Sequence, residues 1–345
     1  MQEPTPTDAV WVPISKRPVH PNHGIHSPQQ SAPERRRGSV RRTSTIDSVR
    51  PGAMMGDFHQ TGRARDLRTH ADGSWEILKE ASVFAIVDMS NFFSLTELHT
   101  DPHREELAAL IGRSVSTGFR AATVALIPDE RDRATLLNLL LDDLPGAALV
   151  SGYAIGASGV KFERKEGSPV LQVPDLCAGF QRGGTMMTEI DATGRPPTVT
   201  GPRAPSLIRH KDPVAWHQLL PLPARGMRRW RCLDVWLEGP DIKAEAYFRD
   251  SHMDEDLVET VVHEYTVQVT IDPITQTVQT SDTTAHSLPW VECIQAQNSG
   301  SRISGMALLS LRPVVREEFV GISTCTHLND TLRSIEDVRA LIEFL

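Results

Sequence analysis

The chain has 345 residues and a formal net charge of -8, and its composition is 39% hydrophobic but only 6% aromatic. This length fits one large domain or two of ordinary size, with cores built mainly from aliphatic side chains. The acidic balance argues against nucleic acid as the main partner, because phosphate binding requires a basic surface.

Two further features lead us to expect a cytoplasmic protein without a membrane partner. No run approaches the roughly 18 apolar residues of a membrane helix, and the N-terminus lacks an apolar core of signal-peptide length. The cysteines are too few for a disulfide scaffold, so in this compartment they indicate metal binding, catalysis or buried packing. They are Cys177, Cys232, Cys293 and Cys325. The oligomeric state stays open.

Residues 1–38 predict an irregular N-terminal arm. They hold many of the prolines and a His-rich piece interrupted by Pro21 and Gly24. Those two residues favour a solvated loop over a metal site.

After the arm, the sequence indicates an internal duplication. Residues 41–47 and 228–234 both begin with Arg-Arg and end with Asp. Two strand-like runs follow in each half, at 82–90 and 92–100 and at 261–271 and 276–283, and then helical stretches at 105–112 and 302–311. Each half closes with a helix that opens at a threonine, Thr135 or Thr324. The shared order and near-equal spacing predict two similar units, although any two mixed segments of this length align loosely.

The predicted fold class is α+β, with two similar units at 39–150 and 216–345. Each unit would be a small antiparallel sheet of about four strands with helices on one face. The alternation from His263 to Ile271 is typical of a half-buried strand, and Asp272-Pro273 predicts the turn into its partner. Residues 151–215 join the units as a long Gly/Pro-rich segment, for which we favour a lid over a plain linker.

The residues best suited to chemistry lie in the second unit. Cys325 and His327 stand at the head of the last helix, where Thr324 is the predicted N-cap and the helix dipole favours a thiolate at Cys325. Cys293 lies at a loop-to-helix junction. His263 begins a strand whose partner leads to that loop, so the four positions can meet at one end of the sheet.

Two thiolates and two neutral imidazoles form a standard zinc set that also suits iron. We therefore predict one divalent metal ion, zinc in preference to iron, bound by His263, Cys293, Cys325 and His327. A regular helix would splay Cys325 and His327 by about 200°, so either the first turn is irregular or only three residues bind. The alternatives are a metal-free catalytic thiolate with a histidine base and simple buried packing of the cysteines.

The first unit lacks these residues. Leu136 and Asn138 stand where the second unit has Cys325 and His327. A unit that keeps the fold without the ligands indicates that the fold does not require them.

Three acidic residues near the predicted ligands have separate expectations. Asp330, one turn after His327, is the candidate catalytic base or an orienting partner for an imidazole, with capping or solvent exposure as the alternative. Asp250 is expected to form a surface ion pair with Arg249. Glu264 should point away from the face that carries His263.

At these residues the chain resembles a bacterial domain-of-unknown-function family, number 2889. The resemblance rests on the segments VVHEYTVQVTID, LPWVEC and STCTHLNDTLRS and covers roughly residues 228–340. It implies the same His, Cys and Cys-x-His order but brings no settled activity.

A weaker resemblance concerns the iron–sulfur cluster scaffold proteins. Those have a ligand at the start of a β-hairpin, a cysteine after it and a His/Cys pair at the head of the last helix. His263, Cys293, Cys325 and His327 follow that order, but His263 replaces a cysteine, which suits a single metal better than a cluster.

Three functions follow from these features. The first is a metal-dependent enzyme acting on a small organic substrate, in which the metal polarises a carbonyl or activates water and residues 151–215 close over the pocket. The second is an iron–sulfur or sulfur-transfer scaffold. The third is a duplicated structural module with a stabilising metal.

Overall fold

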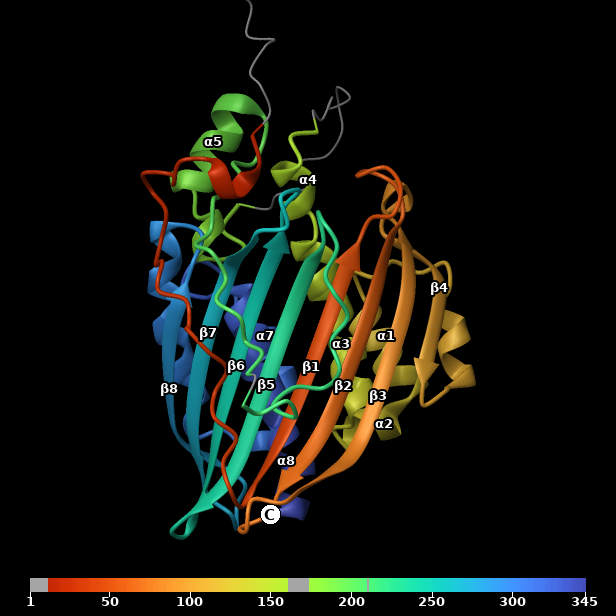
Figure 1. The fold of residues 1–345 in the computed structure, drawn as a ribbon, viewed down its shortest axis with the longest axis vertical. Helices are drawn as coiled ribbons and strands as arrows, with labels where there is room; N and C mark the ends of the chain where they lie inside the picture. Colours follow the sequence, from red (N-terminus) through yellow and green to blue (C-terminus); the bar gives the residue numbers. More distant parts are fainter. Residues whose placement is uncertain (1–11, 161–173, 210) are drawn as a thin grey trace, which may run out of the picture.

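The structure is a computed structural model that describes residues 12–160, 174–209 and 211–345. Eight antiparallel strands form one sheet in the order β4-β3-β2-β1-β5-β6-β7-β8 (Figure 1). The strands are β1 (Ser39–Val49), β2 (Phe58–Thr69), β3 (Trp75–Asp88), β4 (Ser94–Asp101), β5 (Met227–Glu238), β6 (Asp241–Met253), β7 (Glu259–Ile271) and β8 (Val278–Ser287). The mixed α+β class is confirmed.

The two halves of the sheet are joined directly through their first strands. Strands β1 and β5 pair antiparallel from Ser39 opposite Trp236 to Ser48 opposite Met227. The structure therefore has one continuous sheet in place of the two small sheets that were predicted to be joined by a long segment. The pattern of apolar and polar residues along a strand does not show which distant strand pairs with it, so the pairing of β1 with β5 could not be predicted.

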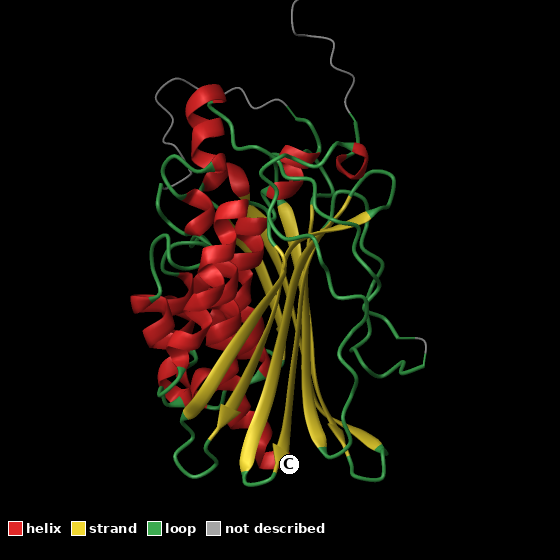
Figure 2. Ribbon diagram, turned by 90° about the vertical axis from the view of Figure 1, so that its left-hand side faces the viewer, coloured by secondary structure: helices red, strands yellow, loops and turns green. Residues whose placement is uncertain are grey.

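Helices cover one face of this sheet, as Figure 2 shows. Helix α3 packs on β1, β2 and β3, α7 packs on β6 and β7, and α8 packs on β1 and β5. The helices are α1 (Phe119–Leu126), α2 (Pro128–Asp132), α3 (Leu136–Val150), α4 (Tyr153–Ala157), α5 (Thr185–Thr193), α6 (Leu311–Glu318), α7 (Thr326–Ser334) and α8 (Val338–Leu341). Short 3-10 helices include η3 (Glu105–Leu110), η4 (Ala178–Phe180) and η5 (Val291–Ile303).

The two predicted helix starts have different outcomes. The Thr135 hydroxyl accepts a hydrogen bond from the Asn138 amide at 3.1 Å, which confirms Thr135 as the N-cap of α3. Helix α7 instead takes Cys325 as its N-cap. The Thr324 hydroxyl turns back and donates to the Gly321 carbonyl at 2.9 Å, so the predicted N-cap lies one residue too early.

Irregular segments cover the opposite face of the sheet, which is called the open face below. The N-terminal arm and the segment before β5 run along it (Figures 1 and 2). Together with the sheet they bury a small apolar cluster made of Ala32, Leu207, Ala215, Trp216, Trp230, Cys232 and Tyr247. Residues 1–11 of the predicted arm and 161–173 of the predicted lid lie outside the described residues.

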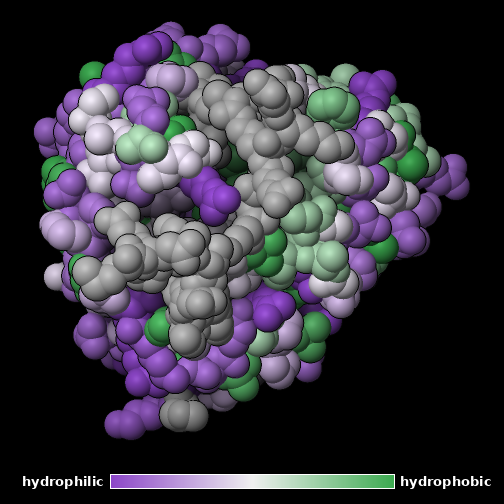
Figure 3. All heavy atoms as spheres, turned by 90° about the horizontal axis from the view of Figure 1, so that it is seen from above, coloured by the Kyte–Doolittle hydropathy of each residue, from purple (hydrophilic) through white to green (hydrophobic). Residues whose placement is uncertain are grey.

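Among the described residues, no helix combines the length and apolar character needed to cross a membrane. Seen from above, most visible side chains are hydrophilic, and a smaller hydrophobic group lies right of centre (Figure 3).

Buried arginine–aspartate pairs join the two halves across β1 and β5. On the open face, Arg41 donates to both carboxylate oxygens of Asp234 at 2.7 and 2.6 Å, and Arg228 binds Asp47 in the same two-pronged way. Arg41 also donates to the Pro33 carbonyl at 3.1 Å. The same side chain therefore connects the arm with both halves of the sheet.

Removing one member of such a pair should destabilise the protein strongly. We predict that Arg41→Met lowers the free energy of unfolding by about 3–5 kcal/mol, because it leaves the Asp234 carboxylate buried without its counter-ion. Urea unfolding of the wild type and variant measures this difference. The exposed Arg113→Met variant is the control and should change stability by about 0.5 kcal/mol or less. Equal effects in the two variants would contradict the assigned role of the pair.

Candidate functional site

Neighbouring strands place a carboxylate beside an imidazole near one end of the second half. Asp250 on β6 and His263 on β7 stand directly opposite each other, and the register shifts immediately after Asp250. Such a bulge locally bends a strand and re-aims its side chains, a feature common next to functional sites. Both residues lie on the helix-covered face, which they share with the buried Phe248 and Tyr265.

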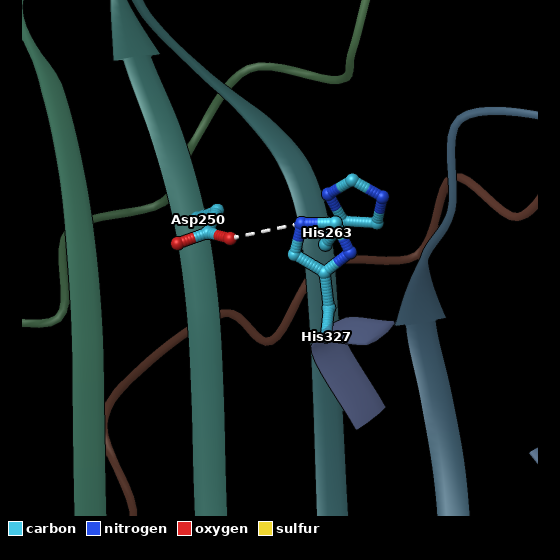
Figure 4. A group of neighbouring side chains, drawn as sticks. All are labelled: Asp250, His263 and His327. Atoms are coloured by element: carbon cyan, nitrogen blue, oxygen red, sulfur yellow. Dashed lines mark ion pairs between the residues drawn. The ribbon is translucent and has the colours of Figure 1, made fainter. Parts of the chain in front are cut away.

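The first turn of α7 adds a second imidazole from above this face. The rings of His263 and His327 stack with centroids 3.6 Å apart and an angle of 16° between their planes. His327 Nε2 lies 3.5 Å from Asp250 Oδ2 (Figure 4). One ligand atom from each of the three side chains lies within 4.8 Å of the other two, and we call Asp250, His263 and His327 the His/Asp group.

Both imidazoles of this group are held in the neutral form. Burial, reinforced by the neighbouring His327 ring, lowers the pKa of His263 well below its usual value. Burial and the positive charge of Arg229 lower the pKa of His327 to about 3. His263 Nδ1 is buried and has no hydrogen-bond partner among the residues that the structure describes. A neutral imidazole nitrogen with no partner is the form that ligates a metal ion.

Cys325 contacts the His/Asp group from the N-cap position of α7. Its backbone is extended, and its Sγ lies 3.8 Å from His327 Nδ1. Because the Cys325 backbone is extended, its sulfur and the His327 ring are not turned apart as they would be in a regular helix. Burial raises the pKa of Cys325 to about 12, although the Tyr265 hydroxyl and two first-turn amides oppose that shift. The thiol is therefore neutral in the absence of a metal ion, contrary to the expected thiolate, because loss of hydration outweighs the helix dipole.

Cys293 lies outside the His/Asp group. It belongs with Cys177 and Cys325 to a set of buried thiols around the Tyr265 hydroxyl, which we call the thiol group. A side chain on Gly179 would begin 3.0 Å from the Cys293 sulfur, so the loop packs tightly against that thiol. Of the four predicted ligands, the structure brings His263 and His327 together, places Cys325 beside His327 Nδ1, and leaves Cys293 outside these contacts.

Asp330 lies outside the His/Asp group and is bound by arginines. Its carboxylate is 2.9 Å from Arg229 and 2.8 Å from Arg333. Burial alone would raise the pKa of Asp330, but these guanidinium groups outweigh it and hold the pKa far below the usual range. The arrangement suits a structural counter-ion better than a general base working near neutral pH.

Sequence reasoning missed Asp250 as a member of the site. The expected surface pair with Arg249 is wrong, since both residues are buried and they face opposite sides of β6. Arg249 pairs with Glu264 at 2.7 Å on the open face, which confirms that Glu264 points away from His263. Asp250 instead binds Arg229 through both oxygens at 2.9 and 3.0 Å. Alternation along β6 separates the two faces, but it cannot reveal which strand lies alongside.

The middle segment of the chain borders both groups of side chains. The Ala178 amide donates to the Thr324 carbonyl at 2.9 Å, beside Cys325. Further along, the Val261 amide donates to the Pro202 carbonyl at 2.9 Å, next to the bulge that precedes His263. Described parts of residues 151–215 therefore contact the surroundings of the site at two points.

Residues 227–341 match the model of a family described as a protein of unknown function, DUF2889. The matched region runs from β5 to α8 and contains the whole His/Asp group. No curated protein and no solved structure matches the chain. The family description carries no activity, so the function has to be inferred from the site.

The neutral state of His327 leads to a testable pH dependence. An unfolded histidine has a pKa near 6.5, whereas folded His327 titrates at about 3, so unfolding takes up a proton between these values. This residue's contribution is fully present above pH 6.5. It is lost as the pH falls, by up to about 1.4 kcal/mol of unfolding free energy per pH unit.

We therefore predict that His327→Gln flattens the loss of stability between pH 6.5 and 4. Urea unfolding of EDTA-dialysed protein at several pH values measures the slope. His99→Gln is the control, because the His99 side chain is 73% exposed and its removal should leave the slope unchanged. A wild-type slope in the His327→Gln variant would count against a buried, neutral imidazole.

Proposed function

We propose that this chain is a metal-dependent enzyme whose centre is the His/Asp group, with Cys325 as an additional ligand. The observation that carries the proposal is the convergence of two neutral imidazoles and a carboxylate from three separate elements, with the buried His263 Nδ1 left without a partner. Burying an unpartnered polar atom is unfavourable, and a metal ion would satisfy it.

The donor set favours zinc over magnesium or calcium. Arg229 already binds both oxygens of Asp250 and competes with a cation for that carboxylate. We therefore expect the affinity to rest on imidazole nitrogen and on a thiolate that Cys325 would form on binding. Nitrogen and sulfur ligands suit zinc, with iron as the alternative, whereas magnesium and calcium prefer oxygen.

A metal held by three or four protein ligands would supply Lewis-acid chemistry, either polarising a carbonyl or activating water. The His327 side chain is 16% exposed, whereas the Asp250 side chain is fully buried. A substrate would therefore approach the metal from the side on which His327 lies. The buried, desolvated surroundings and the bordering middle segment suit a small organic substrate.

We propose a cytoplasmic location with neither nucleic acid nor a membrane as partner, and with residues 151–215 acting as a lid.

We also propose that the two halves arose by duplication. The pairs Arg41–Asp234 and Arg228–Asp47 are reciprocal across the β1–β5 junction. On the helix-covered face, Arg42 binds Asp66 on β2 in the same way as Arg229 binds Asp250 on β6.

The first half keeps this framework but not the site. Asp250 stands opposite His263, whereas the corresponding Asp66 stands opposite Lys79. Asn138 stands where the second half has His327. The loss of both imidazoles from one half supports a functional rather than an architectural role for them in the other.

Metal analysis of purified variants tests the proposed centre. We expect about one zinc ion per chain in the wild type and little or none in His263→Ala and His327→Ala, because each removes a nitrogen ligand. Cys293→Ser should keep its metal, since Cys293 lies in the thiol group alone. Circular dichroism of each variant confirms that it is folded. Full metal content in both histidine variants would refute the proposed centre.

The same preparations separate the two alternative functions. The thiol group favours an iron–sulfur or sulfur-transfer scaffold, which predicts a brown protein with acid-labile sulfide that is lost in Cys293→Ser. A duplicated structural module predicts that removing the metal lowers the melting temperature while no substrate is ever turned over. A colourless zinc protein excludes the scaffold.

A further inference from the structure

A cavity lies on the open face, on the other side of the sheet from the His/Asp group. Its volume is about 460 Å³, within the range of small-molecule pockets. Arg65 of β2 contributes from the sheet, and the other described lining residues are Ile208, Arg209, Asp212, Pro213, Trp216, His217, Gln218 and Leu219. Nothing in the metal proposal uses this cavity.

Arg65 is a buried cation without a counter-ion in this cavity. The residue is 5% exposed, its Nη2 donates to the Val214 carbonyl at 2.6 Å, and its Nε has no partner among the described residues. Within the part of the chain that the structure describes, no carboxylate lies within ion-pair distance of Arg65. The nearby Asp212 is already bound by Arg35 through both oxygens, at 3.0 and 3.2 Å. A buried guanidinium group in this position is costly unless an anion joins it.

Trp216 also lines the cavity and is held in place. Its buried side chain makes an edge-to-face contact with Trp230, with ring centroids 5.1 Å apart. Because the indole Nε1 has almost no accessible surface, Trp216 offers the cavity ring surface rather than a donor. A bound anion would therefore depend on Arg65.

The remaining lining shows what else the ligand must carry. Ile208, Pro213 and Leu219 present apolar surface. His217 cannot supply positive charge, because it lies between Thr43 and Thr45 at 3.0 and 2.9 Å and burial keeps it neutral. The complement of this lining is an oxyanion attached to an apolar body.

We propose that this cavity binds a small organic anion, with its oxyanion on Arg65 and its apolar part against Ile208, Pro213, Trp216 and Leu219. Hydrogen bonds from charged donors to an anion are stronger than neutral ones, so Arg65 should dominate the affinity. The apolar wall should make an organic carboxylate bind better than a bare inorganic ion.

Titration calorimetry with defined probes tests this assignment. Phenylacetate should bind saturably to the full chain, and its uncharged analogue phenylacetamide about tenfold or more weakly, because it lacks the negative charge. Acetate and inorganic phosphate should bind more weakly than phenylacetate, since neither carries the apolar body. Equal binding of phenylacetamide, tighter binding of phosphate, or no saturable binding of phenylacetate would overturn the proposal.

Matched variants locate the binding to the cavity. Arg65→Gln should weaken phenylacetate binding about tenfold or more, because it removes the charged donor. Arg63→Gln removes the same charge from the same face of β2 outside the cavity lining and should stay within about twofold of the wild type. Folding is checked by circular dichroism, and the comparison of phenylacetate with phenylacetamide on the wild type remains informative if Arg65→Gln unfolds. Equal losses in the Arg63 and Arg65 variants would also overturn the proposal.

Discussion

The buried Arg229 guanidinium is the interaction on which the site in the second half depends. It binds both oxygens of Asp250 on β6 and the carboxylate of Asp330 on α7, and it lies 3.6 Å from Asp143 on α3. These contacts fix the start of α7 over β6 and β7, and so set His327 against Asp250. A side chain on Gly146 of α3 would begin 2.7 Å from an Asp330 oxygen, so a glycine is required where the two helices meet around this network.

The sheet is built around charged pairs because both of its faces are covered. Central strands β1 and β5 are buried along most of their length, yet Arg and Asp occupy many of the positions that apolar side chains fill elsewhere. Each buried arginine therefore needs a carboxylate from a neighbouring strand or helix. Arg65 is the described exception on the open face, and this unpaired charge is what distinguishes its cavity from the rest of that surface.

Strands and helices with apolar periodicity could be predicted from the sequence, and those with charged interiors could not. The predicted runs at 82–90 and 261–271 correspond to β3 and β7, and Thr135 caps α3 as expected. Strands β1 and β5 were visible only as a repeated Arg-Arg motif, because their burial rests on ion pairs with distant residues. The same limit explains the site. Cys325 and His327 are close in sequence, whereas the place of Asp250 beside His263 depends on strand pairing, and Cys177 enters the thiol group through a loop with no signature.

The central claim is that the His/Asp group, rather than the thiol group, binds the metal ion. Anomalous diffraction at the zinc edge from crystals of the zinc-loaded protein tests this claim most directly. We predict one peak about 2.0–2.1 Å from a ring nitrogen of His263 and from one of His327, with Asp250 or Cys325 completing the shell. A peak bound only by Cys177, Cys293 and Cys325, or no peak near the two imidazoles, would contradict it.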